Sequence, residues 1–154
     1  LPYRSEVESV AGACGRLLGW AEGPGGAVVL MTGALVSRLG GQWRSWGWEQ
    51  VLRGGWHEET SSLFWEAGGE SFDCLLDSPG EVLSIFRERI LASTVMTVNH
   101  DLPVGAVQII ARRNLLDGAV TWLASVSGGA NLKDATTAAF VVAETERFRS
   151  EYEL

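Results

Sequence analysis

The sequence is poor in the residues from which most catalytic and metal sites are built. It has two cysteines and two histidines among 154 residues. Cys14 and Cys74 are too few and too isolated for a disulfide framework or a zinc site. Each stands beside apolar residues, where a buried free thiol is the usual outcome. We therefore expect no metal and no cofactor.

Basic residues are also scarce. Lys133 is the only lysine, and the formal net charge is −7. Nucleic acids and anionic membranes attract basic surfaces, so neither is an expected partner. The one dense positive spot is Arg112-Arg113. This pair could bind an anion, but two solvated arginines at the end of a hairpin are the interpretation we favour.

Long apolar runs are missing as well. No run approaches the roughly 20 residues that a membrane-spanning helix needs, and no basic-then-apolar leader of signal-peptide form is present. The chain starts at Leu1 rather than at a methionine, so an anchor further upstream would not be seen in it. The expected location is cytoplasmic.

Glycine, by contrast, is abundant. Nineteen glycines, several in pairs between short apolar runs, are typical of strands joined by turns. The stretch from Trp43 to Leu76 holds five of the seven tryptophans and predicts three antiparallel strands. Within it, Gly54-Gly55 indicates a bulge or a close backbone approach. Alternation and turn residues predict strands over residues 16–22, 27–31, 34–39, 51–56, 62–66, 71–76, 93–99, 106–111 and 119–127.

A helix over about 79–92 has the clearest local signal. Ser78 suits the N-cap, Pro79 the first helical position and Glu81 the third, from which its side chain could reach the cap amide. The apolar residues behind them fall within one broad helical face. The first fourteen residues are ambiguous, because Ser5-Glu6-Val7-Glu8 has the form of a capping box but an irregular segment is the alternative.

A last helix is expected from Asn131 or Asp134, either of which could cap it, to about Glu151. Its apolar residues predict a buried stripe on one face, which leaves Phe140 on the opposite face. The stripe consists of Ala138, Val141, Val142, Thr145, Phe148 and Tyr152.

Strands, a helix, further strands and a second helix predict an α+β fold with antiparallel sheet, in a single domain of residues 1–154. Residues 15–92 resemble a bacterial pleckstrin-homology-like domain. The resemblance rests on the order of the short strands, the lead-in Trp48-Glu49-Gln50-Val51, the meander to Leu76 and the helix 79–92. Most of the chain is also similar to a family of uncharacterised actinobacterial proteins. In that family a strand-rich half ends in a helix that reads like Phe86-Arg87-Glu88-Arg89-Ile90-Leu91-Ala92-Ser93. Residues 93–154 would be an added strand-and-helix section. Neither resemblance supplies catalytic residues.

The first resemblance carries one negative expectation. The turn Glu22–Gly26 would match the first strand connection, where phosphoinositide-binding relatives place lysines and arginines. Here the turn offers one glutamate and no basic residue. We therefore expect no binding to phosphoinositides or to anionic membranes.

Two polar clusters could suggest catalysis or metal binding. His57-Glu58-Glu59 contains possible ligands, but no second ligand group has a recognisable spacing, which favours a solvated turn. His100-Asp101 could orient a nucleophile, but no serine or cysteine has a nucleophile-elbow context, which favours a capped turn. No catalytic residue is assigned.

The tryptophans Trp43, Trp46 and Trp48 crowd six residues. One sheet face can hide only residues of one parity, and Trp43 differs in parity from the other two. The favoured interpretation is that the second sheet section or the C-terminal helix covers them. The alternative is an exposed aromatic patch for a partner, since aromatic residues dominate interface hot spots.

These observations favour a non-catalytic domain that acts by binding a protein partner or a second copy of itself. A homodimer would use the C-terminal helix at Phe140 or the Trp43–Trp48 face, since twofold dimers are the commonest oligomers. A small-molecule binder with a tryptophan-lined apolar pocket is the first alternative. An enzyme is the second, and it would need a deep cleft that gathers His57, His100, Cys74 or several carboxylates.

Overall fold

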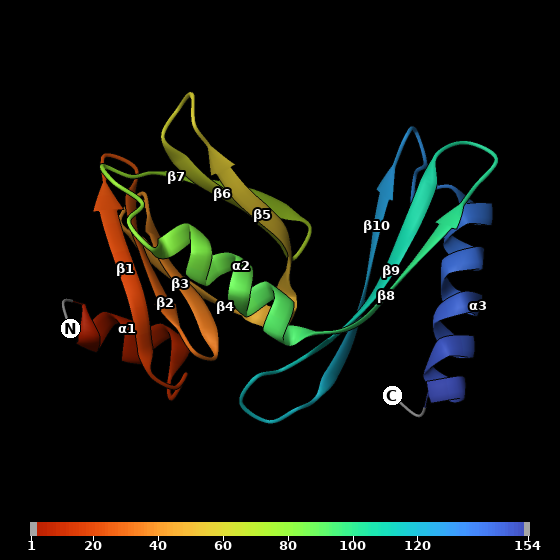
Figure 1. The fold of residues 1–154 in the computed structure, drawn as a ribbon, viewed down its shortest axis with the longest axis horizontal. Coiled ribbons are helices and arrows are strands. Elements are labelled where there is room, and N and C mark those ends of the chain that lie inside the picture. Colours follow the sequence, from red (N-terminus) through yellow and green to blue (C-terminus); the bar gives the residue numbers. More distant parts are fainter. Residues whose placement is uncertain (1–2, 153–154) are drawn as a thin grey trace. The chain divides into compact units, whose positions relative to one another are not determined.

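The computed structural model describes residues 3–152, which form two compact units. Unit 1 comprises the chain up to Ser93 together with residues 114–119, and unit 2 comprises residues 94–113 and the chain from Val120 onward. The break lies one residue after the predicted start of the added section at Ser93, but residues 114–119 of that section belong to unit 1. That both sections form a single domain stays a prediction. Residues 3–152 form three antiparallel sheets and three α-helices, which are labelled in Figure 1, so the predicted α+β class is confirmed.

Unit 1 contains two antiparallel meanders in which each strand pairs with the next. The first sheet consists of β1 (Leu17–Gly23), β2 (Gly26–Met31), β3 (Ala34–Leu39) and β4 (Gln42–Gly47). The second consists of β5 (Val51–His57), β6 (Ser62–Ala67) and β7 (Glu70–Leu75). The three predicted strands of the Trp43–Leu76 stretch are these last three. The separate strand β4, which carries Trp43 and Trp46, was not predicted.

The buried β2 strand explains how unit 1 is layered. Val28 and Leu30 belong to the core between the two sheets, whereas Val29 and Met31 belong to a second core beneath α1 (Arg4–Ala11). Alternate side chains of a strand point to opposite faces. The continuous apolar run is therefore a strand that is covered on both faces.

Aromatic side chains join the two sheets. The Trp46 ring lies 5.8 Å from that of Trp65 and 4.7 Å from that of Phe72, both on the second sheet. After β4 the chain enters a short 3-10 helix, η1 (Trp48–Gln50), which turns Trp48 toward Phe86 of α2 (Val82–Ser93) at 5.7 Å. Ring pairs in such tilted or edge-on arrangements add stability beyond their buried area.

The helix α2 begins three residues later than predicted. Gly80 has a φ of +52°, a left-handed conformation that interrupts helical geometry before Val82. Pro79 is therefore not the first helical position, and Ser78 is not the N-cap. The Val82 amide instead donates to the Pro79 carbonyl at 2.9 Å in a turn that leads into the helix.

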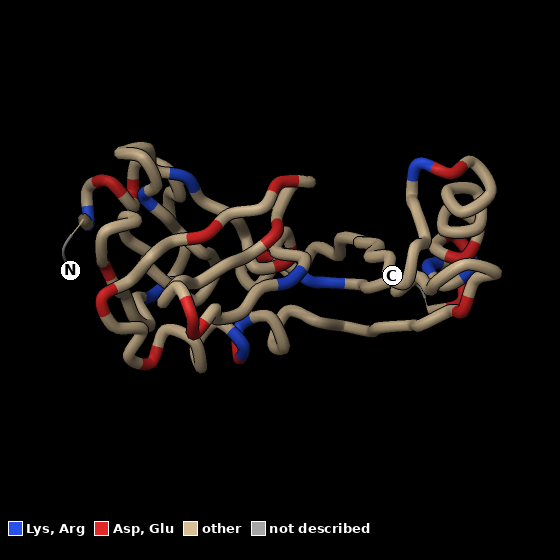
Figure 2. The backbone as a smooth tube through the Cα atoms, turned by 90° about the horizontal axis from the view of Figure 1, so that it is seen from above, with Lys and Arg blue, Asp and Glu red and all other residues tan. Residues whose placement is uncertain are grey.

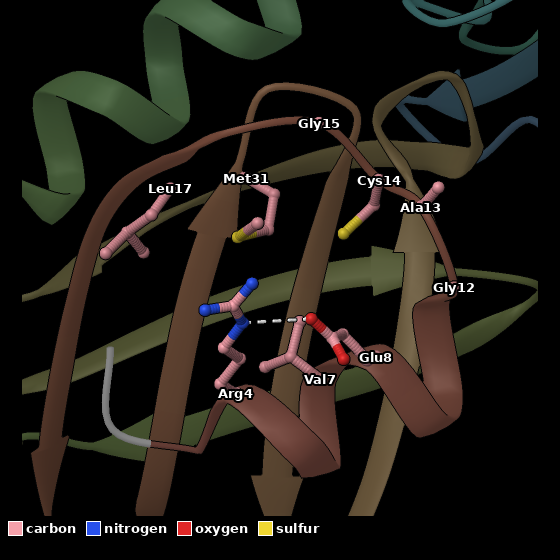
Figure 3. Close-up of a pocket in the computed structure, with 9 residues that line it drawn as sticks. All are labelled: Arg4, Val7, Glu8, Gly12, Ala13, Cys14, Gly15, Leu17 and Met31. Atoms are coloured by element: carbon pink, nitrogen blue, oxygen red, sulfur yellow. Dashed lines mark hydrogen bonds and ion pairs between the residues drawn. The ribbon is translucent and has the colours of Figure 1, made fainter.

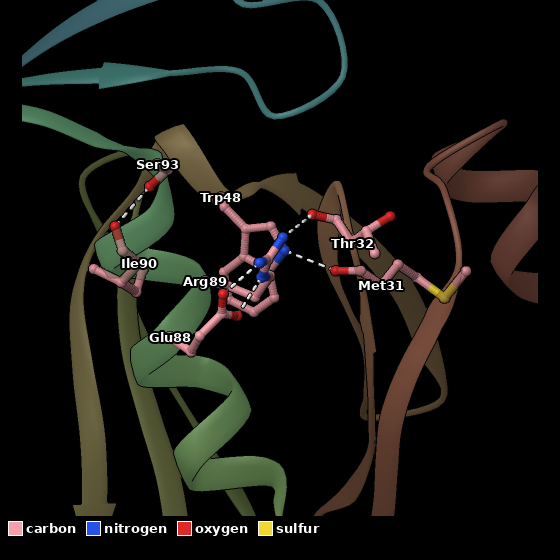
Figure 4. A network of polar contacts seen from close by, with 7 residues as sticks. All are labelled: Met31, Thr32, Trp48, Glu88, Arg89, Ile90 and Ser93. Atoms are coloured by element: carbon pink, nitrogen blue, oxygen red, sulfur yellow. Dashed lines mark hydrogen bonds and ion pairs between the residues drawn. The ribbon is translucent and has the colours of Figure 1, made fainter.

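Polar contacts fix the end of α2 against the first sheet (Figure 4). The Trp48 indole N–H donates to the Met31 carbonyl at 2.9 Å, and Arg89 of α2 donates to the Thr32 carbonyl at 3.2 Å. Arg89 also pairs with Glu88. The loop 114–119 is held on the same unit, because Asn114 donates to the buried Glu49 at 3.2 Å.

Unit 2 is a three-stranded antiparallel sheet with one helix. Its strands are β8 (Thr94–Asp101), β9 (Ala106–Arg113) and β10 (Val120–Ser127), in the order β10-β9-β8, and its helix is α3 (Ala135–Tyr152). Asp134 caps α3, as one of the two predicted alternatives, and accepts from the Thr137 amide at 3.1 Å. None of the helices between residues 3 and 152 is both long enough and apolar enough to cross a membrane.

The face that α3 turns toward the sheet agrees only in part with the predicted stripe. Phe148 is buried and Ala138, Val141 and Thr145 are half-buried, but Val142 and Tyr152 are exposed. The Phe140 ring, expected on the outer face, lies 5.3 Å from His100 of β8 in an edge-on contact. Phe140, Glu144 and Phe148 of α3 all lie next to His100. The inner face of α3 is therefore rotated relative to the face predicted from the apolar residues alone.

Candidate functional site

The side chains with catalytic potential are dispersed. His57 is exposed and stacks on Phe64 at 4.1 Å, and His100 belongs to unit 2, where its Nε2 lies 3.7 Å from a Glu144 carboxylate oxygen. Over residues 3–152, no group of three His, Cys, Asp or Glu residues could hold a metal ion.

Both cysteines are free and buried, as predicted, and they lie in different cores. Burial raises the pKa of the Cys74 thiol to about 11 and also raises the pKa of Cys14. The thiolate is the reactive form of cysteine. Burial therefore favours the protonated, unreactive form of both thiols.

The predicted aromatic surface at Trp43–Trp48 is covered by the protein itself. Trp46 and Trp48 are buried, and the second sheet and α2 cover them. Trp43 is partly buried, with its ring 5.2 Å from that of Tyr3 and the Arg38 guanidinium 5.7 Å above it. The interpretation that the tryptophans belong to the core is confirmed for Trp46 and Trp48, and they are not an interaction surface.

The remaining predicted surface residues also change. Phe140 faces His100 and is not presented outward. Arg112 is buried, and desolvation lowers its pKa, whereas Arg113 at the end of β9 is exposed. The expectation of two solvated arginines therefore holds for Arg113 alone.

Two hollows flank β1 in unit 1. The first, of about 520 Å³, lies beside α1 and is shown in Figure 3. Its charged residues, Arg4 and Glu8, pair with each other at 3.1 Å, and its two sulfur atoms come from Cys14 and Met31. The two opposite charges largely neutralise each other, so this hollow favours neither an acidic nor a basic ligand.

The second hollow is a groove of about 560 Å³ between β1 and the segment that leads into α2. We call it the β1 groove; it is lined by residues 17–22, residues 77–82 and Ile85. Two large apolar side chains border it with much of their surface exposed, Leu17 at 39 % and Trp20 at 41 %. Gly19 lies in its wall and lets Ile85 approach closely, because a Cβ there would lie 2.8 Å from the end of the Ile85 side chain.

The β1 groove runs along an open sheet edge. β1 is the outermost strand of its sheet and pairs only with β2 within it (Figure 1). The Glu22 carbonyl points away from β2, because it accepts from the Asp77 amide at 3.2 Å. Backbone groups alternate sides along a strand, and the register from Gly19 to Gly23 is regular. The N–H and C=O of Trp20, two residues earlier, therefore also point into the groove.

One end of the β1 groove is acidic. Glu22, Asp77 and Glu81 are exposed lining residues, and the lining contains no Lys, Arg or His. The Glu22 carboxylate accepts a hydrogen bond from the Tyr3 hydroxyl, a contact that leaves its charge in place. No ion pair to these three carboxylates is formed within residues 3–152. Elsewhere, acidic and basic positions are interspersed along the chain (Figure 2).

Sequence reasoning did not identify the residues of this groove. A strand over 16–22 was predicted, but nothing in the pattern shows which strand is outermost. The usable signal was Trp20 itself, a large aromatic residue in a strand that also carries Glu22, a residue type that is rarely buried. Comparison with protein family models, with curated proteins and with solved structures found no match to this chain.

Proposed function

We propose that the protein is a non-catalytic module that binds a segment of another protein in the β1 groove. One observation carries this proposal. The outermost strand β1 directs the backbone N–H and C=O of Trp20 into a groove where the side chains of Leu17 and Trp20 are exposed. Extended peptides bind such edges through main-chain hydrogen bonds, and side-chain pockets add specificity. An aromatic residue beside the edge supplies the kind of anchor that dominates interface energies.

The order of the elements supports the same class of function. The resemblance to pleckstrin-homology-like domains rests on a series of short antiparallel strands followed by a helix, and unit 1 has the strands β1 to β7 followed by α2. The filled core counts against the small-molecule alternative. Trp46, Trp65 and Phe72 contact one another there, so these two core tryptophans enclose no empty pocket.

A selection of random dodecapeptides against the whole protein tests the proposal. Enriched peptides should bind at β1, so Trp20→Pro should weaken them by at least about tenfold, because proline removes the N–H that points into the groove. Proline is tolerated on an edge strand where the N–H faces outward, and thermal unfolding checks that the variant folds.

The matched control is Leu91→Ala, which removes a side chain that is 74 % exposed on α2 and does not line the groove. It should leave binding unchanged in a fluorescence anisotropy assay. The proposal fails if no peptide is enriched, or if the enriched peptides bind the folded Trp20→Pro variant as tightly as the original protein.

A further inference from the structure

We infer, on the basis of the proposed function, that the occupant of the β1 groove is a short basic segment that pairs with β1 as a fifth strand of the first sheet. Its basic side chain would lie at the end formed by Glu22, Asp77 and Glu81. An apolar side chain would lie near Leu17 and Ile85 at the other end. Three properties of the groove define this ligand: the length of its open edge, its charge and the position of its apolar surface.

The length of the open edge limits the ligand to a few paired residues. A β-bulge shifts the register between Leu17 and Gly19, so the regular part of the edge begins at Gly19. It ends at Glu22, whose carbonyl is already used by Asp77. Bulges are one way in which proteins restrict the pairing of edge strands. An added strand would therefore pair around Trp20 and would bind reversibly.

The charge of the groove favours a basic ligand. The groove lining contains no basic side chain, and the start of α2 at Val82 contributes about half of one positive charge. Arg38 lies outside the lining, with its guanidinium 5.1 Å above the ring of Tyr3, whose hydroxyl donates to Glu22. The three carboxylates outnumber these positive charges. Each exposed ion pair contributes little to affinity, but together they steer a basic segment into the groove and make its binding sensitive to salt.

The same charges argue against a second copy of this chain as the occupant. Two β1 edges that paired antiparallel would each bring a groove rimmed by Glu22, Asp77 and Glu81, on molecules that each carry a formal net charge of −7. Like charges in such a contact are unfavourable. The edge that regular pairing offers is also too short to offset the repulsion with many main-chain hydrogen bonds.

The probe is a nonapeptide of alternating lysine and valine, which presents lysines on one face of a strand and valines on the other. Its binding to the whole protein should be measured by isothermal titration calorimetry at about 50 mM and about 300 mM salt, where screening differs strongly. We expect binding at low salt that weakens at least about tenfold at high salt. A nonapeptide with glutamate in place of lysine should not bind.

Charge-matched variants separate a specific site from general attraction. The triple variant Glu22→Gln, Asp77→Asn, Glu81→Gln should weaken the lysine peptide at least about tenfold. The control is Glu6→Gln, Glu59→Gln, Asp101→Asn, which changes the net charge equally at exposed residues that do not line the groove. It should bind as the original protein does. Equal losses in both triple variants would overturn the inference.

The outcomes also distinguish this inference from the proposed function. If selected peptides bind β1, as judged by Trp20→Pro, but are neutral or acidic, the basic ligand is wrong while the binding function stands. If neither the selected peptides nor the lysine peptide depends on Trp20, the proposed function fails as well. A dimer in light scattering that Trp20→Pro converts to monomer would replace the basic partner with a second copy.

Discussion

Trp46 and Trp48 stand two residues apart and share a parity, yet different elements cover them. Trp46 lies on β4 and packs against Trp65, whereas Trp48 lies in η1 and packs against Phe86 of α2. The change from strand to 3-10 helix between them redirects the second side chain. Parity within a strand was therefore not enough to decide which tryptophans reach solvent, and the most exposed tryptophan is instead Trp20 on β1.

The Cys74 thiol makes stability depend on pH in the alkaline range. Its pKa is raised from an ordinary value of 9.0 to about 11, chiefly by burial. Below pH 9 the thiol is protonated in both states. Between these two values the unfolded chain releases the proton and the native protein keeps it, so the free energy of unfolding should fall as the pH rises through this window.

Urea unfolding at pH 8 and pH 10.5 measures this effect. Other groups titrate in the same range, so the informative quantity is the difference between the original protein and Cys74→Ala. The variant should lose some stability at both pH values, because a buried side chain is truncated, but its further loss at pH 10.5 should be smaller. Equal further losses would show that the Cys74 thiol does not contribute.

Asp134 and Ser78 were both predicted as helix caps, but the structure gives opposite expectations for their substitution by alanine. Asp134 accepts from the Thr137 amide at 3.1 Å, so Asp134→Ala should destabilise the protein by about 1 kcal/mol. Ser78 lies outside α2, which begins at Val82, so Ser78→Ala should change stability by less than about 0.5 kcal/mol. Chemical denaturation with an unchanged slope checks both. A loss on Ser78→Ala as large as that on Asp134→Ala would contradict the observed start of α2.

The second sheet depends on a close approach between β5 and α2. A Cβ on Gly54 would lie 2.5 Å from the Phe64 carbonyl oxygen and 2.5 Å from the Phe86 ring. Gly54→Ala should therefore destabilise the protein by about 1–3 kcal/mol, as overpacking usually does. Gly55→Ala is the neighbouring control, because its Cβ would meet only the Phe64 ring at 3.2 Å. Urea denaturation should show the smaller loss for Gly55→Ala, and the reverse order would contradict this packing.

The hairpin between β1 and β2 bears on membrane binding. Its turn, Glu22–Gly26, carries a carboxylate and no basic residue. We therefore predict no co-sedimentation with liposomes that contain phosphatidylserine or phosphoinositides at physiological salt, because anionic surfaces recruit basic segments. Arg113 is the exposed member of the one arginine pair. Salt-sensitive binding that Arg113→Gln abolishes would contradict the prediction.

Elements were more predictable than their arrangement. Alternation located nine of the ten strands, because turn residues such as Gly40-Gly41 separate them clearly. It missed β4, where tryptophans of both parities obscure the period. The start of α2 was misplaced because Gly80 adopts a left-handed φ inside an otherwise good capping pattern. The β1 groove depends on which strand lies at an edge and which segment runs beside it, and these are long-range properties that local patterns do not contain.

At the scale of the whole chain, the two units differ in how they are stabilised. Unit 1 has two buried clusters, one between its sheets and one beneath α1. Unit 2 relies on one sheet and one helix, and the only buried residue of α3 is Phe148. A small core of this kind is sensitive to each side chain in it. Substitutions on the inner face of α3 should therefore act on stability before they act on any association.

The predicted homodimer can be tested on α3 with two substitutions of the same kind. Phe140 packs edge-on against His100, so Phe140→Glu should lower the unfolding midpoint by placing a charge in that contact. Val142 is 64 % exposed, so Val142→Glu should leave the midpoint nearly unchanged. If two copies associate through the outer face of α3, Val142→Glu should convert a dimer to monomer in light scattering while the protein stays folded.

If Phe140→Glu dissociates a dimer without lowering the midpoint, the ring is an interface residue and its contact with His100 is unimportant for folding. A monomer at every concentration would contradict self-association and would leave the β1 groove as the binding surface to pursue.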